Sequence, residues 1–232
     1  LRRSRGLGDV YKRQAMHSNL WLNPKPGTDS ALAMSMVQVM LKENLYKPDY
    51  IKEQTDLPFL VRTDTKEFLR REDLSLYGLL AVADNVYYMW DETTKSIVQA
   101  PGTGRADKPF GRDRRKYGTL ELGDIKPSLE GRWIANTLDG EVEVTTVFEL
   151  LKEECENYTP QMASEITGVS PKVIEQTARV FADAQPGMIY AGYASCKWLH
   201  GDLLQRAMLL MLALTGSTCL LYTSPSPRDL RK

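Results

Sequence analysis

Three consecutive residues, Gly27, Thr28 and Asp29, stand directly before a long apolar stretch and are suited to binding an anion or a purine. Glycine lets a backbone approach a ligand closely, and the first turn of a helix attracts anions. The Asp29 carboxylate can pair with the amino groups of a purine. The alternative interpretation is that Thr28 or Asp29 only caps the helix that follows, which is the usual role of such residues at a helix start.

A second candidate is the loop 193–201, where Lys197 lies between Cys196 and Trp198. A lysine with apolar neighbours at the end of a strand can contact an anion or a substrate. The alternative interpretation is a solvated surface lysine. His200 is expected to be a structural hydrogen-bond donor, and because His17 is its only companion histidine, no two-histidine metal site is expected here.

Both candidate loops are expected to follow strands and to lead into helices. Leu20–Leu22 and Met188–Tyr193 are predicted strands, whereas Ser30–Lys42 and Asp202–Leu214 are predicted helices, the first of them buried on more than one side. Ligands of an open parallel sheet bind beyond the carboxyl ends of its strands. The pattern therefore predicts an α/β fold, part of a Rossmann-like parallel-sheet domain, with both loops at one edge.

The residues between these elements are expected to form an inserted, partly antiparallel segment, most variable over 64–131. Asp139-Gly140 is a strong hairpin signal, and Thr-Pro or Ser-Pro pairs indicate helix starts. The predicted strands are Leu57–Val61, Val86–Trp90, Trp133–Thr137 and Glu141–Thr145, and the predicted helices are Pro48–Gln54, Thr146–Glu156 and those starting after Thr159 and Ser170.

The two ends of the chain, residues 1–14 and 219–232, are expected to be foreign to the protein. DNA that can encode Ser4–Gln14 has a reverse complement that, read one base in, encodes CLLYTSPSPR, the residues beginning at Cys219. That DNA resembles a transposon-end sequencing adapter, so both ends are excluded from the fold argument. Residues 15–218 are then expected to be a fragment of a longer α/β domain, which alone should be inactive and should not melt in one sharp transition.

Composition argues against several classes of protein. The excluded ends carry eight basic and two acidic residues, which leaves 22 basic and 28 acidic residues and a net charge of −6. This balance does not favour a nucleic-acid partner. Two remaining cysteines, Cys155 and Cys196, do not form a disulfide or metal-cluster pattern. The longest apolar run, Ala207–Leu214, is well short of the roughly 20 residues of a membrane helix.

Four segments, taken in their order along the chain, identify a protein family more specifically than any single motif does. Together they resemble the catalytic subunit of molybdopterin oxidoreductases of the dimethyl sulfoxide reductase family. The resemblance is strongest to the branch with nitrate reductase, nitrite oxidoreductase, selenate and chlorate reductases, dimethyl sulfide dehydrogenase and ethylbenzene dehydrogenase. It covers nearly all of residues 15–218. The segments are LWLNPKPGTDSALAMSMVQVM, YIKEQTDLPFLVR, YTPQMASEITGVSPKVIEQTARVFA and IYAGYASCKWLHGDLLQRAMLLMLALTG.

The resemblance implies molybdenum held by two molybdopterin guanine dinucleotides. Gly27, Thr28 and Asp29 would hold the guanine end of one dinucleotide, and the loop with Tyr193 would line the pterin and the substrate funnel. Lys197 would face the molybdenum pocket, where nitrate reductase has a histidine. The molybdenum ligand and the motif for an iron–sulfur cluster are expected upstream, so no metal ligand is expected here.

The resemblance also implies the partners of the whole protein. These are an iron–sulfur electron-transfer subunit and a small-molecule or oxyanion substrate, with membrane attachment only through partner subunits and a periplasmic or membrane-associated location. The alternative is a structural relative without molybdenum, such as the large subunit of complex I. The presence of Gly27-Thr28-Asp29 beside a pocket loop favours the enzyme, while the substrate stays open.

Overall fold

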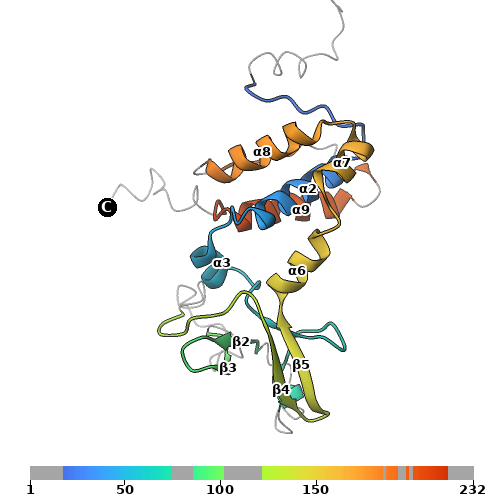
Figure 1. The fold of residues 1–232 in the computed structure, drawn as a ribbon. Coiled ribbons are helices and arrows are strands. Elements are labelled where there is room, and N and C mark those ends of the chain that lie inside the picture. The colour runs from blue at the N-terminus through green and yellow to red at the C-terminus, as the bar shows by residue number, and fades with distance from the viewer. Residues whose placement is uncertain are drawn as a thin grey trace, which may run out of the picture. The chain divides into compact units, whose positions relative to one another are not determined.

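The computed structural model describes residues 18–74, 86–101, 122–184, 187–192, 197–198 and 201–218, and these belong to two compact units (Figure 1). The first, here the helical unit, comprises Leu1–Leu45 and Asn157–Met211. The second, the sheet unit, comprises Tyr46–Glu156 and Leu212–Lys232. The two excluded ends, predicted to be foreign, lie outside the described residues, and the boundaries predicted at 64 and 131 stay predictions.

Helix α2, Asp29–Lys42, is the buried centre of the helical unit. Helices α7, Pro160–Thr167, and α8, Pro171–Asp183, pack against it (Figure 1). Every residue of α2 from Ser35 to Leu41 is buried, so the predicted burial on more than one side is confirmed. Burial of apolar side chains on several sides, rather than helix propensity alone, stabilises such a helix.

Local signals place the ends of these helices. The Thr159 hydroxyl accepts a hydrogen bond from the Met162 N–H at 3.2 Å, and proline follows it at the first helical position. Gly168, at φ +78°, ends α7 in the left-handed conformation that glycine adopts without strain. At the far end of α8, Arg179 makes a bidentate ion pair with Glu43, at 2.7 and 2.8 Å.

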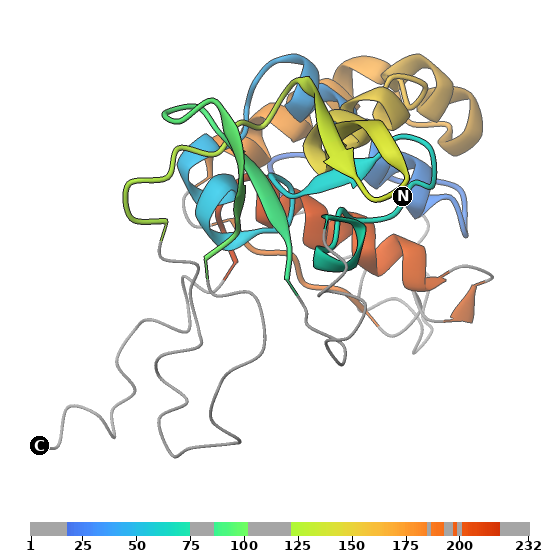
Figure 2. The same ribbon diagram turned by 90° about the horizontal axis from the view of Figure 1, so that it is seen from below.

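Antiparallel strands form the sheet unit. The order of its three-stranded sheet is β1-β5-β4, and β2 and β3 pair with each other (Figure 2). The predicted hairpin at Asp139-Gly140 is confirmed, because Thr137 pairs with Gly140 across it. The strands are Leu60–Arg62 (β1), Tyr88–Asp91 (β2), Ser96–Gln99 (β3), Arg132–Thr137 (β4) and Gly140–Thr146 (β5).

Three short helices accompany these strands: α3, Pro48–Gln54, α4, Arg71–Leu74, and α6, Val147–Cys155. Helix α6 follows β5 directly, with the Thr146 hydroxyl accepting a hydrogen bond from the Glu149 N–H at 3.1 Å. The predicted helix Pro48–Gln54 is therefore confirmed, and the predicted helix Thr146–Glu156 is confirmed with each end one residue shorter. Helix α9, Gly201–Leu214, also begins within one residue of its predicted start, and Gly216 beyond it has φ +64°.

Apolar and aromatic side chains fill the core of the sheet unit. One buried cluster consists of Leu60, Leu69, Ala135 and Val144. Beside it, the rings of Trp90 and Trp133 stack with centroids 4.8 Å apart, so a side chain of β2 contacts one of β4. Phe59 forms a second cluster with Met89 and Ala100.

Two strand predictions are wrong. The described residues of Leu20–Leu22 and Met188–Tyr193 form no strand, and Trp21 and Tyr190 are 66% and 94% exposed. A strand needs a neighbour to receive its backbone hydrogen bonds, and no described strand pairs with either segment. All strand pairs in the described part of the chain are antiparallel, so the antiparallel segment is confirmed but the Rossmann-like parallel sheet is not.

Candidate functional site

The residues before α2 form a tight turn that requires glycine. The Lys25 carbonyl accepts a hydrogen bond from the Thr28 N–H at 3.2 Å, which closes a four-residue turn. Pro26 occupies its second position, and Gly27, at φ +81°, its third. Proline followed by a residue with positive φ is the signature of a type II turn. Gly27 therefore serves the backbone conformation as well as the close approach expected from the sequence.

The turn is anchored to the end of a neighbouring helix. The Lys25 N–H donates a hydrogen bond to the carbonyl of Thr167, the last residue of α7, at 3.0 Å. Because Gly168 ends that helix in a left-handed conformation, the carbonyl is left for a partner outside the helix. Helix α7 thus holds one side of the turn.

Thr28 does not cap α2 with its side chain. It occupies the N-cap position, but its hydroxyl donates a hydrogen bond back to the Lys25 carbonyl at 2.6 Å. Asp29 is half-buried at the first helical position, and its carboxylate makes no hydrogen bond or ion pair with any described residue. The capping interpretation therefore fails for both side chains, and no described residue occupies the Asp29 carboxylate.

The structure brings Trp198, a described residue of the second candidate loop, to this turn. A Cβ atom built on Gly27 would lie 3.2 Å from Cε3 of Trp198, so the indole packs on the glycine. Sequence reasoning named Trp198 only as a neighbour of Lys197 and gave it no role. Its one signal in the sequence was a large aromatic residue in a loop that also carried a candidate lysine.

The structure does not place the other predicted site residues at the Gly27 turn. Lys197 is exposed, and the structure shows no contact between it and the Gly27 turn. Tyr193 and His200 lie outside the described residues. The described site therefore consists of the Gly27 turn, the start of α2 and Trp198.

Comparisons with known proteins agree with the family predicted from the sequence. The chain is 42% identical over 220 residues to perchlorate reductase subunit alpha of Dechloromonas aromatica and 39% identical over 206 residues to dimethylsulfide dehydrogenase subunit alpha of Rhodovulum sulfidophilum. Both alignments cover 89% of this chain. Respiratory nitrate reductase subunit alpha of Haloferax mediterranei is 37% identical over 212 residues, or 91% of this chain.

The chain is homologous to the molybdopterin catalytic subunits of the dimethyl sulfoxide reductase family. These homologues are molybdenum-dependent oxidoreductases, several of them reductases that support anaerobic respiration. The chain spans only 21–23% of the length of these three relatives. No family model matches the chain. Among solved structures, acetylene hydratase from Pelobacter acetylenicus aligns with 88% of this chain and 16% of its own, at 17% identity and a TM-score of 0.45.

The described residues fit a nucleotide-type cofactor better than a metal ion. Within the described ranges, no group of three or more histidine, cysteine, aspartate and glutamate side chains is arranged to hold a metal. Asp29, by contrast, offers an uncommitted carboxylate beside the N–H groups of a helix start, which lack partners within the helix. A molybdopterin-type molybdenum cofactor is expected for these homologues. No described helix has the length and apolar content needed to cross a membrane.

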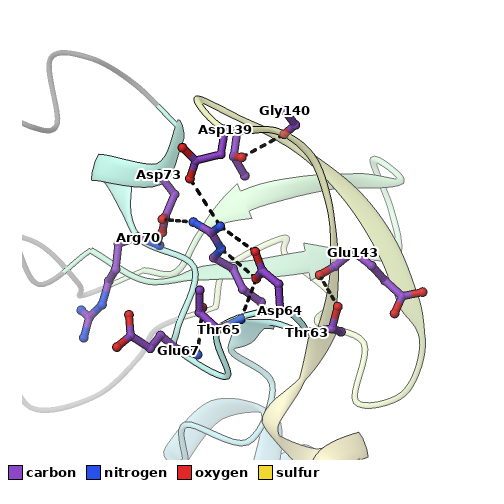
Figure 3. Close-up of polar contacts among 11 residues, drawn as sticks. Thr63, Asp64, Thr65, Glu67, Arg70, Asp73, Asp139, Gly140 and Glu143 are labelled. Atoms are coloured by element: carbon purple, nitrogen blue, oxygen red, sulfur yellow. Dashed lines mark hydrogen bonds and ion pairs between the residues drawn. The ribbon is translucent and has the colours of Figure 1, made fainter.

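A second polar cluster, in the sheet unit, is structural. Arg62 is only 8% exposed, and its guanidinium donates hydrogen bonds to Asp64 at 2.8 Å, Asp73 at 2.6 Å and Asp139 at 3.4 Å. In Figure 3 these three carboxylates point toward a common centre. One buried cation thus joins residues near β1, α4 and the β4–β5 hairpin. Sequence reasoning did not find this cluster, because its members are far apart along the chain.

The Arg62 cluster leads to a prediction about pH. Hydrogen bonds from Arg62 lower the pKa of Asp64 to about 2. An Asp64 pKa below its usual value of about 3.9 means that this carboxylate stabilises the fold fully above roughly pH 4, and that its contribution is lost as the pH falls toward 2. We expect Asp64→Asn to be cleaved faster than wild type by pepsin at pH 4, with the difference shrinking toward pH 2. Digesting unlabelled wild type and the isotope-labelled variant in one tube, and measuring the ratio of labelled to unlabelled peptides from the β4–β5 hairpin by mass spectrometry, removes the pH dependence of pepsin itself. If the ratio of variant to wild-type hairpin peptides does not change with pH, the prediction is contradicted.

Asp91 and Cys155 are also structural. The Asp91 carboxylate accepts hydrogen bonds from the backbone N–H groups of Lys126, Thr93 and Thr94, which hold its pKa well below its usual range and close the β2–β3 turn. Burial raises the pKa of the Cys155 thiol to about 11, so the thiol is not ionised at neutral pH. Neither group is available for catalysis.

Proposed function

We propose that this chain is part of the cofactor-binding region of a molybdenum-dependent oxidoreductase and that Gly27, Thr28 and Asp29 bind a guanine nucleotide end of its cofactor. The observation that carries the proposal is the Asp29 carboxylate, which has no hydrogen-bond or ion-pair partner among the described residues and is held at the start of α2 by a turn that requires glycine. Homology to molybdopterin catalytic subunits supports it. The fold proposed for the complete domain is Rossmann-like.

The proposed cofactor is the bis(molybdopterin guanine dinucleotide) form of molybdenum. When bound, it supplies two-electron oxygen-atom transfer or hydroxylation. The Asp29 carboxylate would accept hydrogen bonds from the amino groups of guanine, and Gly27 would let the backbone approach the ligand. Tyr193 and Lys197 would line the pterin and the substrate pocket, where the lysine charge would stabilise an oxyanion.

The whole protein would exchange electrons with an iron–sulfur subunit and carry an iron–sulfur cluster of its own outside this chain. Relatives named subunit alpha support such an assembly. We propose a periplasmic or membrane-associated complex, with membrane contact through partner subunits and an oxyanion or other small molecule as substrate. The net charge of −6 for residues 15–218 does not favour a nucleic-acid partner.

The full-length protein tests this proposal directly. It is produced in a host that makes the cofactor, and its molybdenum is measured by mass spectrometry and its GMP after acid hydrolysis. Close to one molybdenum and two GMP per polypeptide support the proposal. Protein that is reproducibly free of both, beside a control enzyme loaded in the same host, favours the alternative of a relative without molybdenum.

Asp29→Asn is expected to weaken retention of the cofactor by about tenfold. Hydrogen bonds to a charged group contribute about 1.5–3 kcal/mol. Asparagine replaces one carboxylate oxygen with an NH2 group, which cannot accept a hydrogen bond from the amino groups of guanine. GMP remaining after gel filtration under mild urea measures the effect. Asp49→Asn is the matched control, because Asp49 also lies in the first turn of a helix but is exposed on α3. Equal retention by the two variants contradicts the role of Asp29.

A further inference from the structure

Trp198 occupies an unusual place for a half-exposed aromatic residue. Its indole is 48% exposed, yet the six-membered ring lies over Gly27, with Cε3 and Cζ3 at 3.2 and 3.6 Å from a Cβ built there. Its carbonyl accepts a hydrogen bond from the N–H of Gly201, the first residue of α9, at 3.0 Å. The backbone of Trp198 is therefore hydrogen-bonded to the start of α9, and its side chain contacts the turn before α2.

The Gly27 turn is consequently held from two directions. Lys25 is hydrogen-bonded to the end of α7, and Gly27 is covered by the indole. The absence of a side chain on Gly27 is what permits the ring to lie this close. The indole restricts the turn without using any of its polar groups, so Trp198 leaves the Asp29 carboxylate without a partner among the described residues.

We propose that Trp198 is a positioning residue for the nucleotide-binding turn. Its indole holds Gly27 in the left-handed conformation, and so keeps Asp29 at the first position of α2 in the binding geometry. This inference rests on the function proposed above, because it assigns Trp198 to the same site. It also explains how a loop from the start of α9 reaches the cofactor site through packing rather than through a polar contact.

The test compares Trp198→Ala, Trp198→Phe and Trp21→Ala in the full-length protein. Trp21 is the matched control, since it is an exposed tryptophan of the same helical unit. The first measurement is hydrogen exchange of peptides covering residues 27–36 in protein made without the cofactor. We expect exchange to become about fivefold faster in Trp198→Ala, as for the loss of about 1 kcal/mol of aromatic packing, and to stay near wild type in the other two variants.

The second measurement is the rate at which the loaded enzyme loses GMP on warming, with kcat and KM recorded on the protein that stays loaded. We expect about fivefold faster loss in Trp198→Ala, with recovery in Trp198→Phe. Unchanged exchange and unchanged GMP loss in Trp198→Ala overturn the inference. A change in KM alone, with normal exchange and loading, also overturns it, because Trp198 would then act on the substrate.

The exchange measurement does not depend on cofactor binding, so the two hypotheses can fail separately. Faster exchange at residues 27–36, with a wild-type protein that never contains GMP, supports the packing role of Trp198 but overturns its assignment to a nucleotide site, together with the proposed function. Normal GMP content in wild type and in Trp198→Ala, with equal rates of loss, leaves the proposed function intact and overturns only the role of Trp198.

Discussion

Gly27→Val in the full-length protein is expected to lose most of its molybdenum and GMP. Valine is branched at Cβ and is strained at φ +81°, and its Cβ would stand 3.2 Å from the Trp198 ring. A left-handed non-glycine residue costs about 1–2 kcal/mol, and the contact adds to it, so we expect a total of about 2–3 kcal/mol. At about 1.4 kcal/mol for each factor of ten, cofactor affinity falls roughly 30- to 100-fold.

Gly123→Val is the control for Gly27→Val. Gly123 also has positive φ, +58°, but nothing lies within 4 Å of a Cβ built there. Backbone strain is therefore introduced in both variants, whereas a clash at the proposed site occurs in only one. Metal analysis and GMP release are measured on both after circular dichroism confirms folding. Wild-type cofactor content in Gly27→Val would show that this turn does not bind the cofactor.

Arg62→Met is expected to destabilise the sheet unit by about 2–4 kcal/mol. Removing one partner of a buried ion pair leaves the other charge without compensation. Here the loss of Arg62 leaves Asp73, half-buried, close to Asp64 and Asp139 with no cation between them. Arg62 also pairs with Val144 in the sheet, so the strain is expected to reach β5. Methionine keeps the apolar stem, which separates the loss of charge from the loss of packing.

Hydrogen exchange at pH 7, on peptides spanning residues 132–146 of the full-length protein, measures this destabilisation locally. Asp139→Asn is the control, because the Asp139 side chain is 75% exposed and 3.4 Å from the guanidinium. An exposed ion pair contributes roughly 0–1 kcal/mol, so this variant should exchange almost as wild type does. Similar exchange in the two variants would contradict the central role of Arg62.

Local signals in the sequence predicted most helices correctly. Proline after Thr159 or Ser170 marks the starts of α7 and α8, and Asp139-Gly140 marks the hairpin. Each signal acts through backbone hydrogen bonds within about four residues, so distant parts of the chain hardly alter it. The predictions of strands at Leu20–Leu22 and Met188–Tyr193 were wrong because a strand depends on residues far away in the chain. A short apolar run becomes a strand only when another strand pairs with it, and that partner must come from elsewhere in the chain.

For the candidate site too, some features could be predicted from the sequence and others only from the tertiary structure. The sequence alone identified Gly27, Thr28 and Asp29 as candidates and predicted the family, since both depend on residue order. Only the tertiary structure shows that the Thr28 hydroxyl turns back to Lys25, that Asp29 is uncommitted and that Trp198 covers Gly27. The contact of Trp198 with Gly27 joins segments that are remote in sequence. It depends on how α7 and α9 pack around the turn, which no local pattern of residues encodes.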